Sequence, residues 1–435
     1  MHSLIVSCKK DYDARHIVGV PYSKSISNRL LIIKYLSKTK GEITSLSSAD
    51  DTTLLKNFLL QVIHKTSDYF NCKNAGTTLR FLLSVLAITE GKWFIDADKR
   101  MQFRPILPLI DILNSLGADI KIADKENLFP ITIIGKQLKT DKDIVIDNYL
   151  TSQIISSLLL ISPKINGNLT LVLSHNQPSM PYINMTIALV NRFKGKIERK
   201  NNTIICHQSE YNFTNLQVEG DYSAASIFYL FEMVGKYKNL QINNIKKSNL
   251  QADAIVEKLF NFLGVQTIHS DNSILLSYNE SLNKKFDLEN TPAIEFNIND
   301  TPDLFPALAV ALFLNNRRAV IIGIETLKVK ESNRLISIQN ELNKIEKRCY
   351  IKEKEFIIEK SKQENFPNNL CDKSFVFQTY NDHRIAMALS AFAIVCKQIT
   401  INNSDCVEKS FPDFWQQCST FFNYLSSDIP KERII

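Results

Sequence analysis

The chain has 435 residues, of which 44% are hydrophobic and 22% are charged, and 52 basic residues against 45 acidic ones give a net charge of +7. This composition excludes disordered and fibrous classes, and the charge is too mild and too dispersed for a dedicated nucleic-acid binder. The chain is too long for one compact core, so we expect two or three domains, a cleft between them and small anionic ligands.

Cysteine usage and hydropathy bear on the compartment. The eight cysteines are scattered and form no close CxxC pairs of the kind that zinc or redox sites use, so we expect reduced thiols in a cytoplasmic protein. The apolar run at the N-terminus is too short for a signal peptide, and the longest one, 304–314, contains Pro306 and is too short to span a bilayer. We therefore expect no membrane segment.

The first predicted helix begins near Lys24, with Ser23 as its N-cap and an apolar stripe at Ile26, Leu30, Ile33 and Leu36. Ser25 and Arg29 are four residues apart and share one face of this helix. Unpaired N–H groups and the positive end of the helix dipole favour an anion at such a helix start. An ordinary capped and solvated first turn is the alternative.

Similar helix starts follow in the first half of the chain. Gly76 precedes the apolar run 81–87 and would let a ligand approach the backbone closely. Arg104 precedes Pro105 and is therefore expected in extended backbone, pointing from a loop. Polar residues also stand before the apolar runs 154–160 and 183–190, namely Thr151, Ser152, Gln153 and Ser179. Each feature alone is also compatible with a turn glycine, a surface arginine or a plain cap.

One pattern recurs four times along the chain: an amphipathic helix, a glycine or polar break, and two short β segments joined by a polar turn. The copies run over 112–134, 190–206, 259–276 and 342–358. A repeated helix and hairpin predicts a multi-copy α/β architecture in which each sheet buries one face against helices. A switch between domains is expected near Gly220.

The second half carries three more specific segments. Asp303 follows Thr301 and Pro302 at the start of an apolar helix, where a carboxylate that complements the helix dipole is as common as a catalytic one. Lys330 and Arg334 are expected one turn apart on one helix face, where like charges repel unless an anion lies between them.

The third segment is Asp382-His383-Arg384, which is expected to cap the apolar helix 385–395. Such a helix must be buried, and it would hold Arg384 at its start. Lys409 precedes a proline turn at Pro412 near the C-terminus.

Taken in order, these segments resemble the enolpyruvyl transferase family, and within it the members that act on shikimate 3-phosphate. The match runs nearly end to end at comparable spacing, through Ser23-Lys24-Ser25-Ile26-Ser27-Asn28-Arg29, Asn74-Ala75-Gly76-Thr77, Arg104-Pro105, Ser152-Gln153, Glu219-Gly220-Asp221, Pro302-Asp303, Val329-Lys330-Glu331-Ser332, Arg334-Leu335, Asp382-His383-Arg384 and Lys409-Ser410-Phe411-Pro412-Asp413. Any one of these segments is weak, but the ordered series is specific.

The resemblance implies an α/β fold of two similar domains. Each would contain three repeated βαβαββ-type units arranged as an inside-out α/β barrel, with the active site in the interdomain cleft. Residues 21–220 would form the first enolpyruvyl-transferase domain, and residues 1–20 with 221–435 the second. The resemblance also implies a monomer without metal or organic cofactor, and without nucleic-acid or membrane partners.

The reaction implied by the resemblance belongs to the shikimate pathway of aromatic amino acid biosynthesis. It transfers the enolpyruvyl group of phosphoenolpyruvate to the 5-hydroxyl of shikimate 3-phosphate and releases phosphate. Asp303 would be the base, Glu331 the proton donor and Lys24 the residue that assists the departing phosphate. Matching positions would bind phosphoenolpyruvate through Lys24, Gly76, Arg104, Gln153, Arg334, Arg384 and Lys409. They would bind shikimate 3-phosphate through Lys24, Ser25, Arg29, Thr151, Ser152, Gln153, Ser179, Asp303 and Lys330.

Some positions depart from the family pattern, and two alternatives stay open. Tyr22 and Lys73 replace glycines, and Thr326 stands where some members carry an asparagine on shikimate 3-phosphate. A sister enzyme that acts on UDP-N-acetylglucosamine usually has a reactive cysteine or aspartate in the loop before the residue matching Arg104, and 99–103 has neither. A non-catalytic binding protein on this fold would be expected to lose the cations, which are all present.

Overall fold

The computed structural model describes residues 2–9, 15–39, 41–124, 126–140, 142–147, 151–174, 177–237, 239–284 and 293–426. Contacts within the chain divide it into two compact units. Both chain ends build the terminal unit, Met1–Tyr22 with Glu219–Ile435, and the insert unit, Ser23–Val218, comes between them in the sequence. The sequence places the limits at residues 21 and 220, and the assignment of both units as enolpyruvyl-transferase domains stays a prediction.

The strands are short. In the insert unit they are β3 (Ile43–Thr44), β4 (Tyr69–Asn71), β5 (Gly91–Asp96), β6 (Asp119–Lys121), β7 (Ile131–Gly135), β8 (Ile144–Ile146), β9 (Leu169–Leu173), β10 (Lys196–Lys200), β11 (Thr203–His207) and β12 (Leu216–Gln217). In the terminal unit they are β1 (Ser3–Cys8), β2 (His16–Gly19), β13 (Leu240–Asn243), β14 (Val265–His269), β15 (Ser273–Tyr278), β16 (Ile294–Asn297), β17 (Ala319–Ile322), β18 (Cys349–Lys352), β19 (Glu355–Ile358), β20 (Ser374–Gln378), β21 (Gln398–Asn402) and β22 (Phe422–Ser426).

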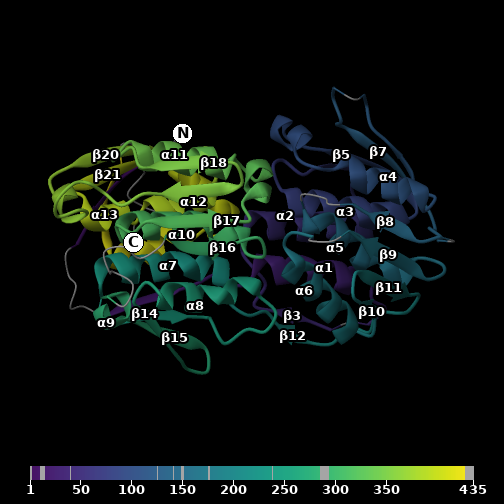
Figure 1. Cartoon of the computed structure of the whole chain (residues 1–435). Coiled ribbons are helices and arrows are strands. Elements are labelled where there is room, and N and C mark those ends of the chain that lie inside the picture. The colour runs from purple at the N-terminus through teal and green to yellow at the C-terminus, as the bar shows by residue number, and fades with distance from the viewer. Residues whose placement is uncertain are drawn as a thin grey trace. The chain divides into compact units, whose positions relative to one another are not determined.

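Along the chain, the helices come between these strands (Figure 1). In the insert unit they are α1 (Lys24–Leu36), α2 (Asp50–His64), α3 (Gly76–Ile88), α4 (Leu107–Ser115), α5 (Ser152–Ile161) and α6 (Met180–Arg192). In the terminal unit they are α7 (Tyr222–Gly235), α8 (Val256–Asn261), α9 (Glu280–Lys284), α10 (Phe305–Leu314), α11 (Arg334–Asn343), α12 (His383–Leu389), α13 (Phe392–Val395) and α14 (Phe414–Gln417). Short 3₁₀ turns that position candidate residues are η1 (Lys99–Phe103), η4 (Pro302–Leu304), η5 (Glu325–Val329) and η7 (Ser404–Lys409).

One sheet plan recurs five times in the described residues. A parallel strand pair is extended by two antiparallel strands, in the order β4-β5-β7-β6, β8-β9-β11-β10, β16-β17-β19-β18, β2-β13-β15-β14 and β20-β21-β1-β22. In the last sheet the N-terminal strand β1 supplies the strand that the C-terminal part of the chain lacks. A separate parallel pair, β3 with β12, joins the two ends of the insert unit.

The four predicted helix-and-hairpin copies are confirmed as α4-β6-β7, α6-β10-β11, α8-β14-β15 and α11-β18-β19. In three of them an asparagine side chain joins the helix to the hairpin by two hydrogen bonds. Asn114, Asn191 and Asn343 each donate to a strand carbonyl and accept from the N–H of the same strand residue, at distances of 2.8–3.0 Å. An asparagine at a helix end can satisfy both backbone groups at once, which fixes where the following strand begins.

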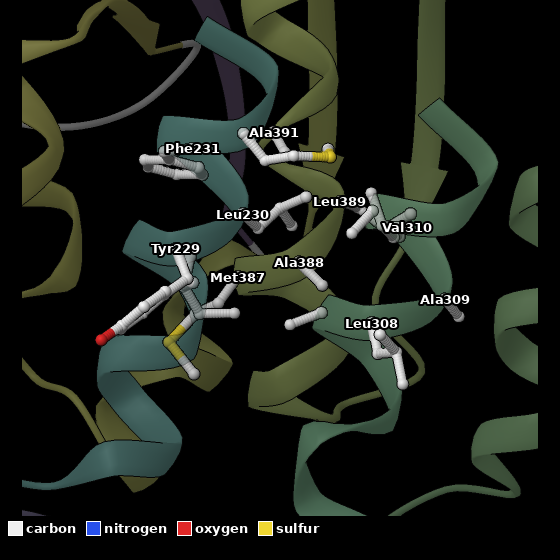
Figure 2. Close-up of a cluster of buried hydrophobic side chains, with 14 of the residues drawn as sticks. Tyr229, Leu230, Phe231, Leu308, Ala309, Val310, Met387, Ala388, Leu389 and Ala391 are labelled. Carbon is white, nitrogen blue, oxygen red and sulfur yellow. The ribbon is translucent and has the colours of Figure 1, made fainter. Parts of the chain in front are cut away.

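Three helices form the core of the terminal unit. Figure 2 shows side chains from α7, α10 and α12 packed against one another, among them Leu230, Val310 and Leu389. Every residue of α10 and of α12 is buried. Helices that are apolar on all sides must be surrounded by protein, so they lie inside the unit with the sheets around them. The predicted burial of the segment 385–395 is confirmed for α12, although the helix breaks at Ser390 and Ala391.

The corresponding helices of the insert unit are α1, α3 and α5, which also pack against one another. The predicted start of α1 is confirmed, since Ser23 caps the helix by accepting from the N–H of Ile26. Thr151 caps α5 in the same way through the N–H of Gln153. Buried central helices thus bring their N-terminal turns, which carry the candidate residues, to defined places in the unit.

The predicted placement of Lys330 and Arg334 on one helix face is wrong, because α11 begins only at Arg334 and Lys330 is in extended backbone after η5. Asn333 caps α11 through its side chain and stops the helix from extending further back. Across the described ranges, no helix is long and apolar enough to cross a membrane.

Candidate active site

Asp303 is the centre of a charged cluster in the terminal unit. Its Oδ1 lies 3.2 Å from Lys330 Nζ and 2.8 Å from Arg334 Nη1, and its Oδ2 lies 2.9 Å from Arg384 Nη2. Asp303 stands on η4, directly before the buried helix α10, and Arg384 stands on the first turn of α12. Three candidate cations therefore converge on one candidate carboxylate.

Two further acids extend this cluster. Glu331 lies 2.8 Å from Arg334 Nη2 and 3.6 Å from Lys409 Nζ, which ends η7. Asp382 is fully buried, lies 2.8 Å from Arg334 Nε and accepts from the N–H of Arg384. Asp382 thereby holds two of the candidate arginines at once, Arg334 by its side chain and Arg384 by its backbone. We call these residues the Asp303 cluster: Asp303, Lys330, Glu331, Arg334, Asp382, Arg384 and Lys409.

Burial and charge act in opposite directions on Asp303. Burial alone would raise the pKa of Asp303, but Arg384, Lys330 and Arg334 attract its charged form and hold the pKa well below its usual value. Burial would lower the pKa of Arg384, but Asp303 keeps it above the usual value. Nearby Asp253 has a pKa raised to about 6, first by burial and then by repulsion from Asp303. Asp303 is therefore ionised at neutral pH.

A second group of candidates lies in the insert unit around Gly76. A Cβ placed on Gly76 would lie 2.8 Å from Cζ of Arg104, so the Arg104 guanidinium rests directly over this glycine. Gln153, at the start of α5, donates from Nε2 to Thr77 Oγ1 at 3.0 Å. The buried side chain of Arg80 donates to Oε1 of Gln153 at 2.9 Å and to the carbonyl of Gly76 at 3.1 Å. Gly76, Arg104 and Gln153 are thus gathered around one position.

Lys24 and Arg29 both belong to α1 but have different surroundings. Lys24 Nζ lies 3.2 Å from Oδ2 of the buried Asp51. Arg29 is also buried, and its donors meet neutral oxygens: Thr186 Oγ1 at 2.7 Å, the carbonyl of Ser25 at 2.8 Å, Ser156 Oγ at 3.1 Å and the carbonyl of Tyr182 at 3.2 Å. Burial lowers the pKa of Arg29 to about 10. No carboxylate of the described residues pairs with it.

Three candidate hydroxyl groups stand at helix starts. Thr151 and Ser152 begin α5, and Ser179 precedes α6 with a φ of 59°. Ser152 and Ser179 are buried, and α5 packs against α6. The hydroxyl of Ser179 does not cap its own helix. Backbone N–H groups at both helix starts, together with these hydroxyls, are suited to a phosphate.

Comparison with known proteins decides the family. A family model described as EPSP synthase (3-phosphoshikimate 1-carboxyvinyltransferase) matches residues 59–418. The chain belongs to the EPSP synthase family. The 3-phosphoshikimate 1-carboxyvinyltransferase of Bacteroides fragilis (strain YCH46) is 32% identical over 399 residues, which cover 92% of this chain and 93% of that protein. The one from Buchnera aphidicola subsp. Cinara cedri is 30% identical over 436 residues, with coverage of 94% and 95%.

Solved structures support the same fold. EPSP synthase from Acinetobacter baumannii aligns with a TM-score of 0.73 at 18% identity, covering 98% of this chain and 100% of that one. The enolpyruvyl transferase NikO from Streptomyces tendae aligns with a TM-score of 0.71 at 12% identity, covering 99% and 100%. At these identities the likeness concerns the fold alone, and it confirms the predicted α/β class of repeated units.

The family departures have local explanations in part. Lys73 has a φ of 47°, a left-handed conformation that glycine adopts without strain, which accounts for glycine at this place in the EPSP synthase pattern. Tyr22 forms an isolated bridge with Gly220 where the chain passes between the units. Thr326 is buried, and its hydroxyl has no hydrogen-bond partner among the residues described.

Sequence reasoning missed three residues that hold the candidate substrate-binding side chains in place. Asp382 was assigned only to a cap, although an acid directly before a buried arginine is a signal for pairing. Arg80 follows Thr77 by three residues, and Asp51 begins α2 as the second of two acids. Within the described ranges, no group of three or more His, Cys, Asp or Glu residues could hold a metal ion. None of the eight cysteines forms a disulfide, as expected.

Proposed function

We propose that this protein is a 3-phosphoshikimate 1-carboxyvinyltransferase, which transfers the enolpyruvyl group of phosphoenolpyruvate to the 5-hydroxyl of shikimate 3-phosphate and releases phosphate. The observation that carries the proposal is the Asp303 cluster, in which Lys330, Arg334 and Arg384 converge on one carboxylate. Family membership supports the interpretation of this cluster as a substrate site rather than a structural one. We further propose that the protein acts as a cytoplasmic monomer, without metal or organic cofactor.

The substrates carry phosphate and carboxylate groups, which need matched cations and donors once they leave water. We assign phosphoenolpyruvate to Lys24, the backbone of Gly76, Arg104, Gln153, Arg334, Arg384 and Lys409. We assign shikimate 3-phosphate to Lys24, Ser25, Arg29, Thr151, Ser152, Gln153, Ser179, Asp303 and Lys330. Arg29 supports this assignment, because a buried guanidinium without a carboxylate partner in the described residues is stabilised by a bound anion.

Substrate binding would change the chemistry of Asp303. In the Asp303 cluster three cations hold the pKa of Asp303 well below its usual value, which makes it a weak base. Substrate anions that draw Arg334 and Arg384 away would leave burial as the dominant influence and raise that pKa. Asp303 could then accept the proton of the 5-hydroxyl only when both substrates are present.

The proposed reaction is an addition followed by an elimination. The 5-oxygen bonds to C2 of phosphoenolpyruvate and gives its proton to Asp303, while Glu331 gives a proton to C3. The resulting tetrahedral intermediate then returns a proton from its new methyl group to the Glu331 carboxylate as the bond from C2 to the phosphate oxygen breaks, and the proton on Asp303 passes to the departing phosphate. Lys24 would stabilise the departing phosphate, and the C2–C3 double bond is restored. This scheme uses one base and one acid.

Measurement of phosphate release tests the proposal. The purified protein with phosphoenolpyruvate and shikimate 3-phosphate should release phosphate, and Lys24→Met should abolish turnover. Release with UDP-N-acetylglucosamine in place of shikimate 3-phosphate would favour the sister enzyme. Binding of phosphoenolpyruvate without release in either mixture would favour a non-catalytic binding protein.

A further inference from the structure

Arg80 is a buried cation in the insert unit to which neither the sequence pattern nor the proposed mechanism gives a role. Its side chain is among the largest fully buried ones, with an exposed fraction of 1%. Nε donates to the carbonyl of Pro105 at 2.9 Å, and Nη1 donates both to the carbonyl of Gly76 and to Oε1 of Gln153. Nη2 donates to the carbonyl of Pro105 as well. Each of these bonds ends on a neutral oxygen.

These acceptors belong to three segments that are distant in the sequence. Gly76 begins α3, Pro105 follows Arg104 after η1, and Gln153 lies in the first turn of α5. Each segment carries one residue assigned to phosphoenolpyruvate: Gly76, Arg104 and Gln153. A planar guanidinium offers donors in fixed directions, so one side chain can hold the three segments in a single arrangement.

Arg80 also decides which way the amide of Gln153 faces. An arginine has no acceptor, so only Oε1 of Gln153 can meet it, and Nε2 must lie on the other side. There Nε2 donates to Thr77 Oγ1 at 3.0 Å, and its second hydrogen is the one that an anionic ligand would take. The orientation of the donor is therefore fixed before a ligand binds.

We propose that Arg80 is a positioning residue for phosphoenolpyruvate, which holds Gly76, Arg104 and Gln153 in place without touching the substrate. This inference rests on the proposed function. Of the three residues that it holds, only Gln153 is also assigned to shikimate 3-phosphate, and none of the four bonds above reaches Ser25, Arg29 or Ser179, so shikimate 3-phosphate should depend on Arg80 less. The expected signature is a larger effect on phosphoenolpyruvate than on shikimate 3-phosphate.

The test is Arg80→Lys, which keeps the positive charge but loses the planar guanidinium and its donors in fixed directions. We expect the KM for phosphoenolpyruvate to rise about tenfold or more, because several charge-assisted bonds are lost, while the KM for shikimate 3-phosphate changes less than about threefold. The matched control is Arg348→Lys in the terminal unit. Arg348 is also buried and donates to the carbonyls of Glu359 and Phe313, but it holds no candidate segment. This control should lower thermal stability and leave both KM values unchanged.

A second variant covers poor folding of Arg80→Lys. Thr77→Val removes the partner of Gln153 Nε2 without a change in size or charge, and it should raise the KM for phosphoenolpyruvate in the same direction by a smaller factor. A folded Arg80→Lys or Thr77→Val protein with an unchanged KM for phosphoenolpyruvate would overturn the inference. So would a folded Arg80→Lys protein with both KM values raised equally. If the wild-type protein releases no phosphate, the proposed function fails. Calorimetric titration with phosphoenolpyruvate then tests Arg80 directly. Equal affinity of the wild type and Arg80→Lys for phosphoenolpyruvate would overturn the positioning role.

Discussion

The candidate residues of the two units balance their charges in different ways. In the terminal unit, Lys330, Arg334 and Arg384 all meet the carboxylate of Asp303. In the insert unit Lys24 pairs with Asp51, but the bonds of Arg29 given above end on carbonyl and hydroxyl oxygens. Cations that are held by neutral groups keep their charge available for an anion. Cations that are held by a carboxylate must first give it up.

This difference separates binding from chemistry. The surroundings of Arg29 have the properties of a preorganised anion site, whose geometry is paid for during folding. In the terminal unit, the proposed substrate anions would compete with Asp303 for the same cations, which would couple binding to the basicity of Asp303. We infer that a base which becomes active only after its cations are occupied protects against reaction with one substrate alone.

The largest expected effect is that of Asp303→Ala. We expect turnover to fall by about 10²- to 10⁴-fold, the usual contribution of a general base. Binding of phosphoenolpyruvate should not weaken, because Lys330, Arg334 and Arg384 lose the carboxylate with which an anion competes. Phosphate release gives the first quantity and calorimetry the second. Turnover close to that of the wild type would remove Asp303 from the mechanism, and weaker binding would contradict the competition.

The next effect concerns one of the cations. Arg384→Met should weaken the binding of phosphoenolpyruvate by about 2–5 kcal/mol, since an anion is then left buried with one cation fewer. The same change removes the largest attraction that lowers the pKa of Asp303, that of the Arg384 guanidinium. The acidic limb of the pH profile of kcat/KM should therefore move to higher pH. A weaker affinity with an unmoved acidic limb would show that Arg384 binds ligand without controlling Asp303.

A buried acid without cations provides the contrast to Asp303. Glu232 lies inside α7, and neither of its oxygens has a hydrogen-bond partner of good geometry among the described residues. Burial raises the pKa of Glu232 from 4.5 to about 9, and the backbone of Tyr278 offsets only part of this rise. Between these two values the folded protein keeps a proton that the unfolded chain has released, so stability must fall as pH rises.

Glu232→Gln removes this proton release. Relative to the wild type, the variant should gain about 1.4 kcal/mol of unfolding free energy per pH unit between pH 5 and 8. Urea unfolding at several pH values measures the gain. The control is Glu341→Gln, because Glu341 is equally buried but accepts from Lys344, the N–H of Gln378 and the hydroxyl of Tyr380. That variant should be less stable than the wild type, and a stability gain for Glu232→Gln that does not depend on pH would contradict protonation of Glu232.

The sequence predicted the repeats and the start of α1 well because both depend on local signals, whereas the predicted start of α11 was four residues too early. The helix-and-hairpin copies follow from periodicity, and the start of α1 follows from Ser23 and the apolar stripe. Long-range pairing has no such signal: the use of β1 in the sheet of β20, β21 and β22 could not be read from the segments themselves. The same holds for the site. Lys330 and Arg334 were identified as partners of an anion, but the placement of Asp303 between them depends on three segments meeting in space.

The smallest effect tests how neutral groups hold Arg29. Thr186 is fully buried, and its hydroxyl accepts from Arg29 Nε at 2.7 Å and lies 3.0 Å from Ser156 Oγ. In Thr186→Val the Nε donor is left buried without its acceptor, and the guanidinium should turn away from its ligand position. We expect the KM for shikimate 3-phosphate to rise about fivefold, with little change for phosphoenolpyruvate.

Two further variants separate this positioning effect from a loss of packing. Thr186→Ser keeps the hydroxyl and should retain a KM near that of the wild type. Ser157→Ala removes a buried hydroxyl that bonds only to the carbonyl of its own helix, at Ile154, among the contacts described, and should change neither KM. An equal rise for both substrates in Thr186→Val would mean that Arg29 supports the insert unit as a whole. In that case the neutral acceptors stabilise the fold around Arg29 and do not orient it toward shikimate 3-phosphate. The two units would then differ only in the acids that pair with their cations.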